Sequence, residues 1–212
     1  MGARACHEAP ADEARACARR LGETVRVTGE FQTSAPYLAA VLRGLRARGQ
    51  DAEVMRRAGP ALEDFFRAPS ARAWWGPDVV RPFFDAVFET GGGELMREVG
   101  RFAVYDSISA IVRPLVAVLT VISGATPTTF FSRYPQLTQA ALDHVGFQWK
   151  ATSETSGVLT VSYPCPVRRE FAHLWEGCFD FTFETARREG ELVSTRHDGE
   201  GRFEFELRWK AA

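Results

Sequence analysis

Three residues in the second half of the chain could form part of a zinc site. They are Cys165, His173 and Cys178, and their side chains bind zinc through thiolate or imidazole groups. If His173 and Cys178 share a helix, their separation puts the two side chains roughly 140° apart around its axis. No fourth ligand stands at zinc-binding spacing. We therefore expect no metal site, with Cys178 as a small core residue and His173 in solvent.

The same residues could be taken for a cysteine hydrolase. The helical separation keeps His173 away from Cys178, so these two do not form a nucleophile and its base. Cys165 could still meet a histidine from elsewhere, such as His144 or His197. However, a cysteine between two prolines more simply marks a rigid turn. We expect no thiol catalysis.

Three consecutive glycines, Gly91 to Gly93, stand before a helical pattern and could cradle a phosphate. A phosphate-binding loop follows a strand and carries a lysine and a hydroxyl residue at fixed offsets. None of these features accompanies the three glycines. They therefore predict a break between two helices.

Arg113 is the most informative charged residue of the chain. It precedes Pro114 within Phe102 to Ile122, the most apolar stretch. A buried guanidinium needs a partner, which Asp106, Asp85 or a bound carboxylate could supply. The stretch from Phe102 to Ile122 carries two full charges near its middle, Asp106 and Arg113. They favour a buried helix over a membrane span.

The last third of the chain predicts a four-stranded antiparallel sheet. From Arg202 to Trp209, apolar and charged residues alternate with the period of a strand that has one buried face. Leu192 to Arg196 supplies the other arm of that hairpin. Phe147 to Ala151 and Val158 to Tyr163 form a second hairpin.

Between the hairpins, Val167 to Glu189 predicts a helix that Gly190 ends. Its charged residues fall on one stripe roughly 120° wide, counted at about 100° per residue. Apolar side chains occupy most of the rest. The sheet would cover one side of this helix, and the first half of the chain would cover another.

Helical patterns dominate the first half. Residues 1–22 predict a tail or a short helix, and Thr24 to Phe31 predicts an edge strand. Three helices are expected first: one from the N-cap Ser34 to Gly49, one from Asp51 to Ala58, and one that starts at Pro60. A fourth helix runs from Asp78 to the three glycines, and a fifth from Glu94 to about Ser123 with a kink at Pro114. The last runs from Pro127 to Ala141 with a break near Pro135. Arg72 to Asp78 predicts a loop.

This order of elements predicts an α+β fold. A helical half, residues 32–145, would pack against a ββαββ half, residues 146–212, within one domain that spans residues 23–212. A net charge of −1 gives no electrostatic attraction to nucleic acid or to an anionic membrane. The N-terminus contains no apolar run, so no signal peptide is predicted and we expect a cytoplasmic protein.

Short motifs follow one another along the chain in a recognisable order. They are Arg46-x-x-Gly49-x-Asp51, Trp74-Trp75-x-Pro77, Gly91-Gly92-Gly93, Glu98-Val-Gly-Arg-Phe-Ala103, Trp175-x-Gly177 and Gly201-x-Phe203-x-Phe205-x-x-x-Trp209. This order resembles a set of myxobacterial paralogues of similar length. More distantly, it resembles the 4-vinyl-reductase-type and haem-nitric-oxide-binding superfamily. The resemblance implies a regulatory domain.

The chain departs from that superfamily at the residues that would carry its chemistry. The 4-vinyl-reductase pattern has cysteines in the last hairpin, where His197 and Arg202 stand in this chain. Haem-binding relatives use a Tyr-x-Ser-x-Arg motif, but Tyr105-Asp-Ser107-Ile-Ser109 has no arginine. They also use a preceding histidine, and no histidine lies between His7 and His144. We therefore expect no haem and no other cofactor.

The leading interpretation is a non-catalytic bacterial regulatory domain that senses a small apolar ligand or acts as a protein-interaction module. An apolar cavity between the two halves would be lined by Phe83, Phe102, Arg113, Trp175 and Phe179. One alternative is a ligand-free scaffold or partner-binding subunit, which a filled core and an exposed apolar helix face would favour. The other is an enzyme that uses Arg113 and a nearby carboxylate.

The helical half is also expected to form a homodimer or to bind a protein partner. Its apolar residues cover much of two helices, and monomers rarely expose large apolar patches. These residues are Phe83, Phe84, Val87 and Phe88 on one helix, and Val112, Leu115, Val116, Val118 and Leu119 on the other. Alternatively, Thr24 to Leu45 folds over this surface within one chain.

Overall fold

The computed structural model describes residues 30–123 and 126–211, and for residues 107–123 it describes the backbone alone. The tail expected for residues 1–22, nearly all of the strand expected for Thr24 to Phe31, and the side chain of Arg113 lie outside the described residues. Within them, helices fill the N-terminal half and antiparallel strands lie toward the C-terminus. The fold class is α+β, as predicted.

Three helices and a 3-10 turn follow the short strand at residues 32–34. Ser34 is the N-cap of α2 (Ala35–Ala47), and the proline in the first turn is tolerated because amides there lack helical partners. α3 (Asp51–Ala58) ends at Gly59, whose φ of 75° favours glycine. The 3-10 turn η1 (Pro60–Leu62) and α4 (Glu63–Arg67) follow.

The long element α5 (Pro77–Ser123) consists of two helices joined at the glycine run. Gly91 and Gly92 leave helical geometry, and Gly92 has a φ of 64° and a ψ of −158°. Only glycine adopts this conformation readily, so the predicted break is confirmed. No described helix combines the length and apolar character needed to cross a membrane.

Two short helices, α6 (Pro127–Ser132) and α7 (Tyr134–Thr138), follow α5. Thr126 caps α6 because its side chain accepts a hydrogen bond from the Thr129 amide. The interruption at Arg133 lies two residues before Pro135, close to where the sequence predicts it.

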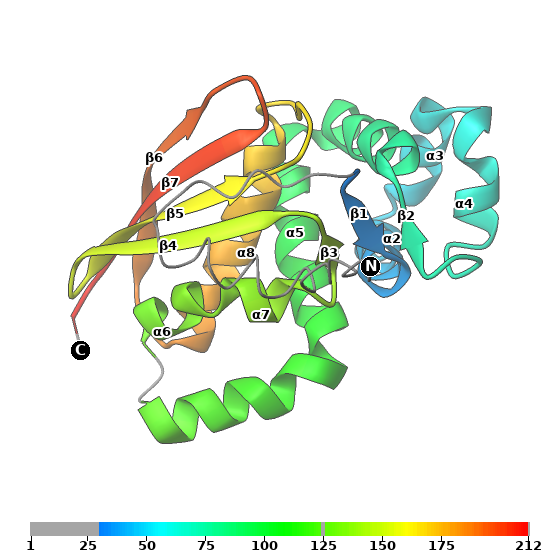
Figure 1. Ribbon diagram of the computed structural model, residues 1–212. Helices are drawn as coiled ribbons and strands as arrows, with labels where there is room; N and C mark the ends of the chain where they lie inside the picture. Colours follow the sequence, from blue (N-terminus) through cyan, green and yellow to red (C-terminus); the bar gives the residue numbers. More distant parts are fainter. Residues whose placement is uncertain (1–29, 124–125, 212) are drawn as a thin grey trace, which may run out of the picture.

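The predicted four-stranded sheet is confirmed. It contains β4 (Gly146–Ser153), β5 (Ser156–Ser162), β6 (Gly190–His197) and β7 (Arg202–Trp209) in the order β4-β5-β7-β6, with all neighbours antiparallel. Both predicted hairpins are present, and β5 joins them by pairing with β7. The helix α8 (Phe171–Thr185) crosses one face of this sheet (Figure 1).

α8 is shorter at both ends than the sequence predicts. The chain leaves the helix through Arg187, whose φ of 52° is left-handed, rather than through a glycine. Gly190 instead begins β6, where a Cβ atom would come within 2.3 Å of the Phe183 ring. Close packing therefore explains this glycine, and the prediction that it ends the helix is wrong.

A second sheet joins three short segments that lie far apart in the sequence. β1 (Gln32–Ser34) pairs with β2 (Trp74–Trp75) on one side and with β3 (Leu142–Asp143) on the other. The prediction of a loop from Arg72 to Asp78 is therefore wrong at the two tryptophans. The Trp75 indole donates a hydrogen bond to the Pro69 carbonyl and packs edge-on against Phe65, which fixes this strand.

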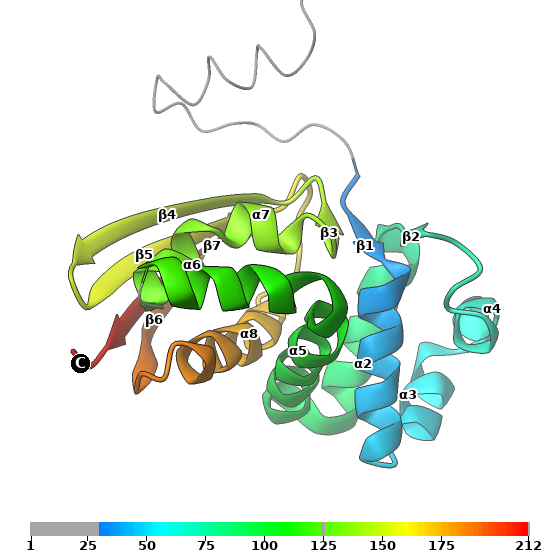
Figure 2. The same cartoon turned by 90° about the horizontal axis from the view of Figure 1, so that it is seen from below.

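α5 lies between α2 and the elements that pack on the four-stranded sheet (Figure 2). Phe83, Phe84 and Val87 are buried within the chain, and α4 supplies Phe65 and Phe66 against Phe83. These three residues of α5 therefore do not form the exposed apolar surface expected for a dimer. The side chains expected on the second helix, at positions 112–119, lie outside the described part.

Candidate ligand cavity

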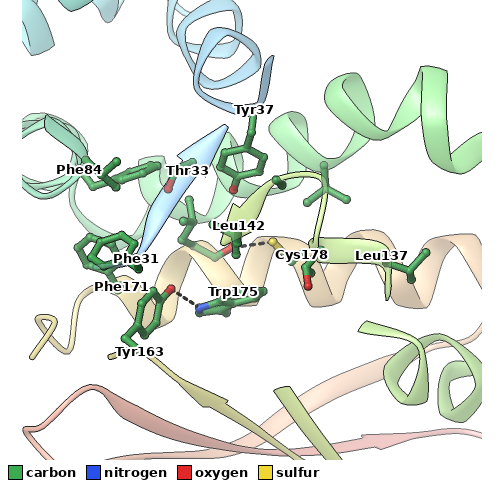
Figure 3. A pocket seen from close by; sticks show the side chains of 15 residues that line it. Phe31, Thr33, Tyr37, Phe84, Leu137, Leu142, Tyr163, Phe171, Trp175 and Cys178 are labelled. Carbon is green, nitrogen blue, oxygen red and sulfur yellow. Dashed lines mark hydrogen bonds between the residues drawn. The ribbon is translucent and has the colours of Figure 1, made fainter. Parts of the chain in front are cut away.

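A cavity of about 50 Å³, counted as the space open to the centre of a water molecule, lies where the helical half meets the ββαββ half. Figure 3 shows β1 and α2 on one side of it and α8 on the other. The described lining is almost entirely apolar and includes no charged side chain. It consists of Phe31, Thr33, Tyr37, Val80, Phe84, Val104, Leu137, Thr138, Ala141, Leu142, Tyr163, Phe171, Leu174, Trp175 and Cys178.

One face of α8 forms the largest part of the lining. Phe171, Trp175 and Cys178 lie at helical spacing and therefore point the same way. The Trp175 indole donates a hydrogen bond of 3.1 Å to the Tyr163 hydroxyl, which follows β5. Tyr163 in turn packs edge-on against Phe31 at 5.3 Å. These contacts fix the aromatic side chains around the cavity.

The side of the cavity opposite α8 is formed by a short segment of the chain, β1 and the start of α2. Thr33 lies in β1, where it pairs with Trp75 on one side and with Leu142 on the other. Tyr37 follows four residues later, in the first turn of α2. β1 and the first turn of α2 thus place two hydroxyl-bearing residues on a wall that is otherwise apolar.

The polar groups of the lining fall into two sets. Cys178 donates to the Leu174 carbonyl at 3.3 Å, and Thr138 donates to the Tyr134 carbonyl at 2.6 Å. Together with the Tyr163 hydroxyl, these groups have partners. The hydroxyls of Thr33 and Tyr37 have no hydrogen-bond partner among the described residues, although the two residues are only 1% and 7% exposed.

Burial keeps the titratable groups of the lining neutral. It raises the pKa of the Cys178 thiol to about 12, and the nearby Asp180 carboxylate adds to the effect. Burial also raises the pKa of Tyr37 well above its usual value, with smaller contributions from Cys178 and Tyr163. A protonated thiol is a poor nucleophile and a poor metal ligand. The lining is therefore suited to binding a neutral molecule.

α5 and α8 cross in direct backbone contact beside the cavity. A Cβ atom at Gly177 would lie 1.9 Å from the Arg97 carbonyl oxygen. A Cβ atom at Gly100 would lie 2.4 Å from the Leu174 carbonyl oxygen. Arg97 also donates two hydrogen bonds, of 2.6 and 2.7 Å, to the Asp180 carboxylate. The two glycines thus allow the close approach that sets the distance between the two halves.

Of the five residues expected to line a cavity, the structure places Trp175 in the lining. Phe83 is fully buried against Phe65 and Phe66, and Phe179 packs against Phe205 on the sheet side of α8. Phe102 is partly buried beneath the Arg48 guanidinium. The lining residues from β1, α2 and β3 were not predicted, because no periodic pattern relates them to α8.

The other residues considered for chemistry lie apart from one another. Arg81 donates to the Cys165 sulfur, and the His173 ring nitrogen Nδ1 lies 3.0 Å from a Glu176 carboxylate oxygen. Cys178 is on the cavity side of α8. In the part of the chain that the structure describes, no three histidine, cysteine or acidic side chains are grouped as a metal site requires.

Solved structures with a similar fold include H-NOX domains. An oxygen-binding H-NOX domain related to soluble guanylate cyclases, in its oxygen complex, is 17% identical with a TM-score of 0.56, and the match covers 84% of this chain and 95% of that domain. The Fe(II) unliganded H-NOX protein from K. algicida is 9% identical with a TM-score of 0.63, and the match covers 84% of this chain and 97% of that protein. Both show a shared fold.

The fold is therefore similar to that of H-NOX domains, as the distant resemblance to the haem-nitric-oxide-binding superfamily implies. No protein-family model and no curated protein matches the chain. The resemblance to myxobacterial paralogues has no support from these comparisons. One further neighbour, 17% identical with a TM-score of 0.57, comes from work on haem distortion in the H-NOX family, so a haem has to be tested against the residues of this cavity.

The described lining does not fit a haem. Its potential iron ligands are a protonated thiol and two protonated phenols, whereas iron binds the ionised forms of these groups. His144, His173 and His197 lie outside the described lining, the sequence of residues 107–123 contains no histidine, and His7 lies outside the described residues. Pockets that bind drug-sized ligands have volumes of roughly 300–1,000 Å³. The cavity volume of about 50 Å³ is far smaller.

Proposed function

We propose that this chain is a non-catalytic regulatory domain that senses a small, neutral, mostly apolar molecule directly, without haem. The supporting observation is the cavity between the two halves, which is lined by side chains from both. A ligand in this position contacts α2 and β1 on one side and α8 on the other. Its binding therefore favours those arrangements of the two halves that fit it best.

The size of the cavity limits the ligand. An engineered apolar cavity of about 150 Å³ binds benzene, which has six heavy atoms. The cavity here has about 50 Å³, a third of that volume, and on this proportion holds roughly two heavy atoms, or up to about four where the lining side chains shift to admit them. The oxygen-binding H-NOX domain is a neighbour whose ligand falls within this range.

Xenon tests the cavity as a site for apolar ligands. We expect saturable chemical-shift changes in both α8 and β1 when xenon pressure is raised over the isotope-labelled protein. Val104→Phe, which fills the cavity from α5, should abolish them. Val193→Phe, at the 44% exposed Val193 on β6, is the matched control and should leave them unchanged. A wild-type protein without saturable changes would contradict the proposal.

Native mass spectrometry of the freshly purified protein complements this experiment. A sensor of this kind should carry either no additional mass or the mass of a small ligand. A retained porphyrin would rule out direct, haem-free sensing. The scaffold alternative requires a filled core, so a bound small molecule would argue against it. The enzyme alternative depends on Arg113 and a nearby carboxylate.

A further inference from the structure

Two hydroxyl groups distinguish this cavity from a simple apolar void. Thr33 and Tyr37 are both more than nine-tenths buried, and both line the cavity. Figure 3 shows their oxygens directed toward the space between β1 and α8. The other polar groups of the lining have protein partners, whereas these two have none among the described residues.

The two hydroxyl oxygens open onto the cavity, so the partner available to them is a molecule inside it, and a hydroxyl left without any partner lowers stability. Two such groups from adjacent elements, facing one small space, therefore point to something that bonds to them. A phenol hydroxyl and an alcohol hydroxyl each have one proton to donate. Tyr37 retains its proton, because burial raises the pKa of its phenol well above the usual value.

We propose that the cavity selects a small neutral molecule with an apolar body and one acceptor atom, to which Thr33 and Tyr37 both donate hydrogen bonds. This inference rests on the proposed function and specifies its ligand class. A carbonyl oxygen suits the site, since it has two lone pairs and carries no charge. A charged acceptor is disfavoured, because the described lining has no cationic side chain to pair with it.

Acetone and 2-methylpropene form a pair of probes that isolates this selectivity. Both have four heavy atoms around a trigonal carbon, and they differ in whether the terminal atom is a carbonyl oxygen or a methylene carbon. Their affinities can be measured by titration of methyl and amide chemical shifts in the full chain. We expect acetone to bind more tightly than 2-methylpropene to the wild-type protein.

Two variants remove the hydroxyls without changing the shape of the cavity. Tyr37→Phe and Thr33→Val should each weaken acetone binding about two- to tenfold, the usual effect of one neutral hydrogen bond. Neither should weaken 2-methylpropene binding. Thr138→Val is the matched control, because Thr138 lines the cavity but donates to the Tyr134 carbonyl. It should leave the ratio of the two affinities unchanged.

The outcomes separate this inference from the function on which it rests. If the wild-type protein binds 2-methylpropene as tightly as acetone, or if neither hydroxyl variant changes the ratio, the selectivity is refuted while the apolar site stands. The same holds if xenon binds and acetone does not displace it. If xenon also fails to bind, both the inference and the proposed function are wrong.

Discussion

Replacing Gly177 with alanine should destabilise the protein, because this glycine allows α8 to touch the backbone of α5. The new Cβ atom would lie 1.9 Å from the Arg97 carbonyl oxygen and 2.6 Å from the Arg101 amide nitrogen, whereas ordinary contact begins at 3.4 Å. Both neighbours are backbone atoms, so no side chain can rotate away. The helices would have to separate locally by about 1.5 Å (3.4 less 1.9).

The magnitude follows from two opposing effects. Forcing an extra carbon into a packed interface costs about 1–3 kcal/mol, and the upper end applies here because the backbone must move. Alanine gains about 1 kcal/mol over glycine in helix propensity. We therefore expect a net loss of about 2 kcal/mol, or a fall in melting temperature of about 4–8 °C for a chain of this length.

Gly44→Ala in α2 is the matched control. Its nearest contact is the Phe102 ring at 2.9 Å, a partly buried side chain that can shift. Guanidinium unfolding followed by circular dichroism should show Gly44→Ala within about 1 kcal/mol of the wild type. The reasoning would be refuted if Gly177→Ala unfolded at the wild-type midpoint, or if both variants lost equal stability.

Three further predictions can be checked with standard methods. Phe205→Asp should prevent folding, because position 205 is fully buried and an unpaired carboxylate there costs several kcal/mol, so a soluble variant with a cooperative melting transition would contradict this. The free energy of unfolding should fall by about 1 kcal/mol between pH 8 and pH 10 through Cys178 alone, because burial raises the pKa of its thiol from an ordinary 9.0 to about 12 in the folded chain, and Cys178→Ala should lose that part of the pH dependence. Elemental analysis should show neither zinc nor iron at near-stoichiometric levels, and a Soret band in freshly purified protein would count against the haem-free interpretation.

The strands with alternating residues were the most predictable part of the fold. In β7, Phe203, Phe205 and Leu207 are all fully buried, and their polar neighbours point the other way. The glycine break in α5 was predictable for a related reason, since three consecutive glycines strongly oppose a continuous helix. Both features depend on local sequence, which a single chain displays directly.

A cavity between the two halves was expected, but most of its lining was not predictable, because the lining depends on contacts between distant segments. Thr33 reaches it through pairing with Trp75 and Leu142, and three residues of β1 are too few to show a strand pattern. Phe83 and Phe179 were also expected in the lining. The structure buries them on other faces of their helices, which only the crossing angles of those helices determine.

The small sheet has a consequence for the order in which the molecule forms. β1 closes loops of about forty and about one hundred residues when Thr33 meets Trp75 and Leu142. The short strand β1 forms few hydrogen bonds with its two neighbours. These bonds offset little of the entropy lost on closing the loops until the rest of the chain has folded. The amides of β1 should therefore gain protection late in refolding and exchange with solvent ahead of those in β5 and β7. The last part of the chain to be secured would then be the wall that carries Thr33.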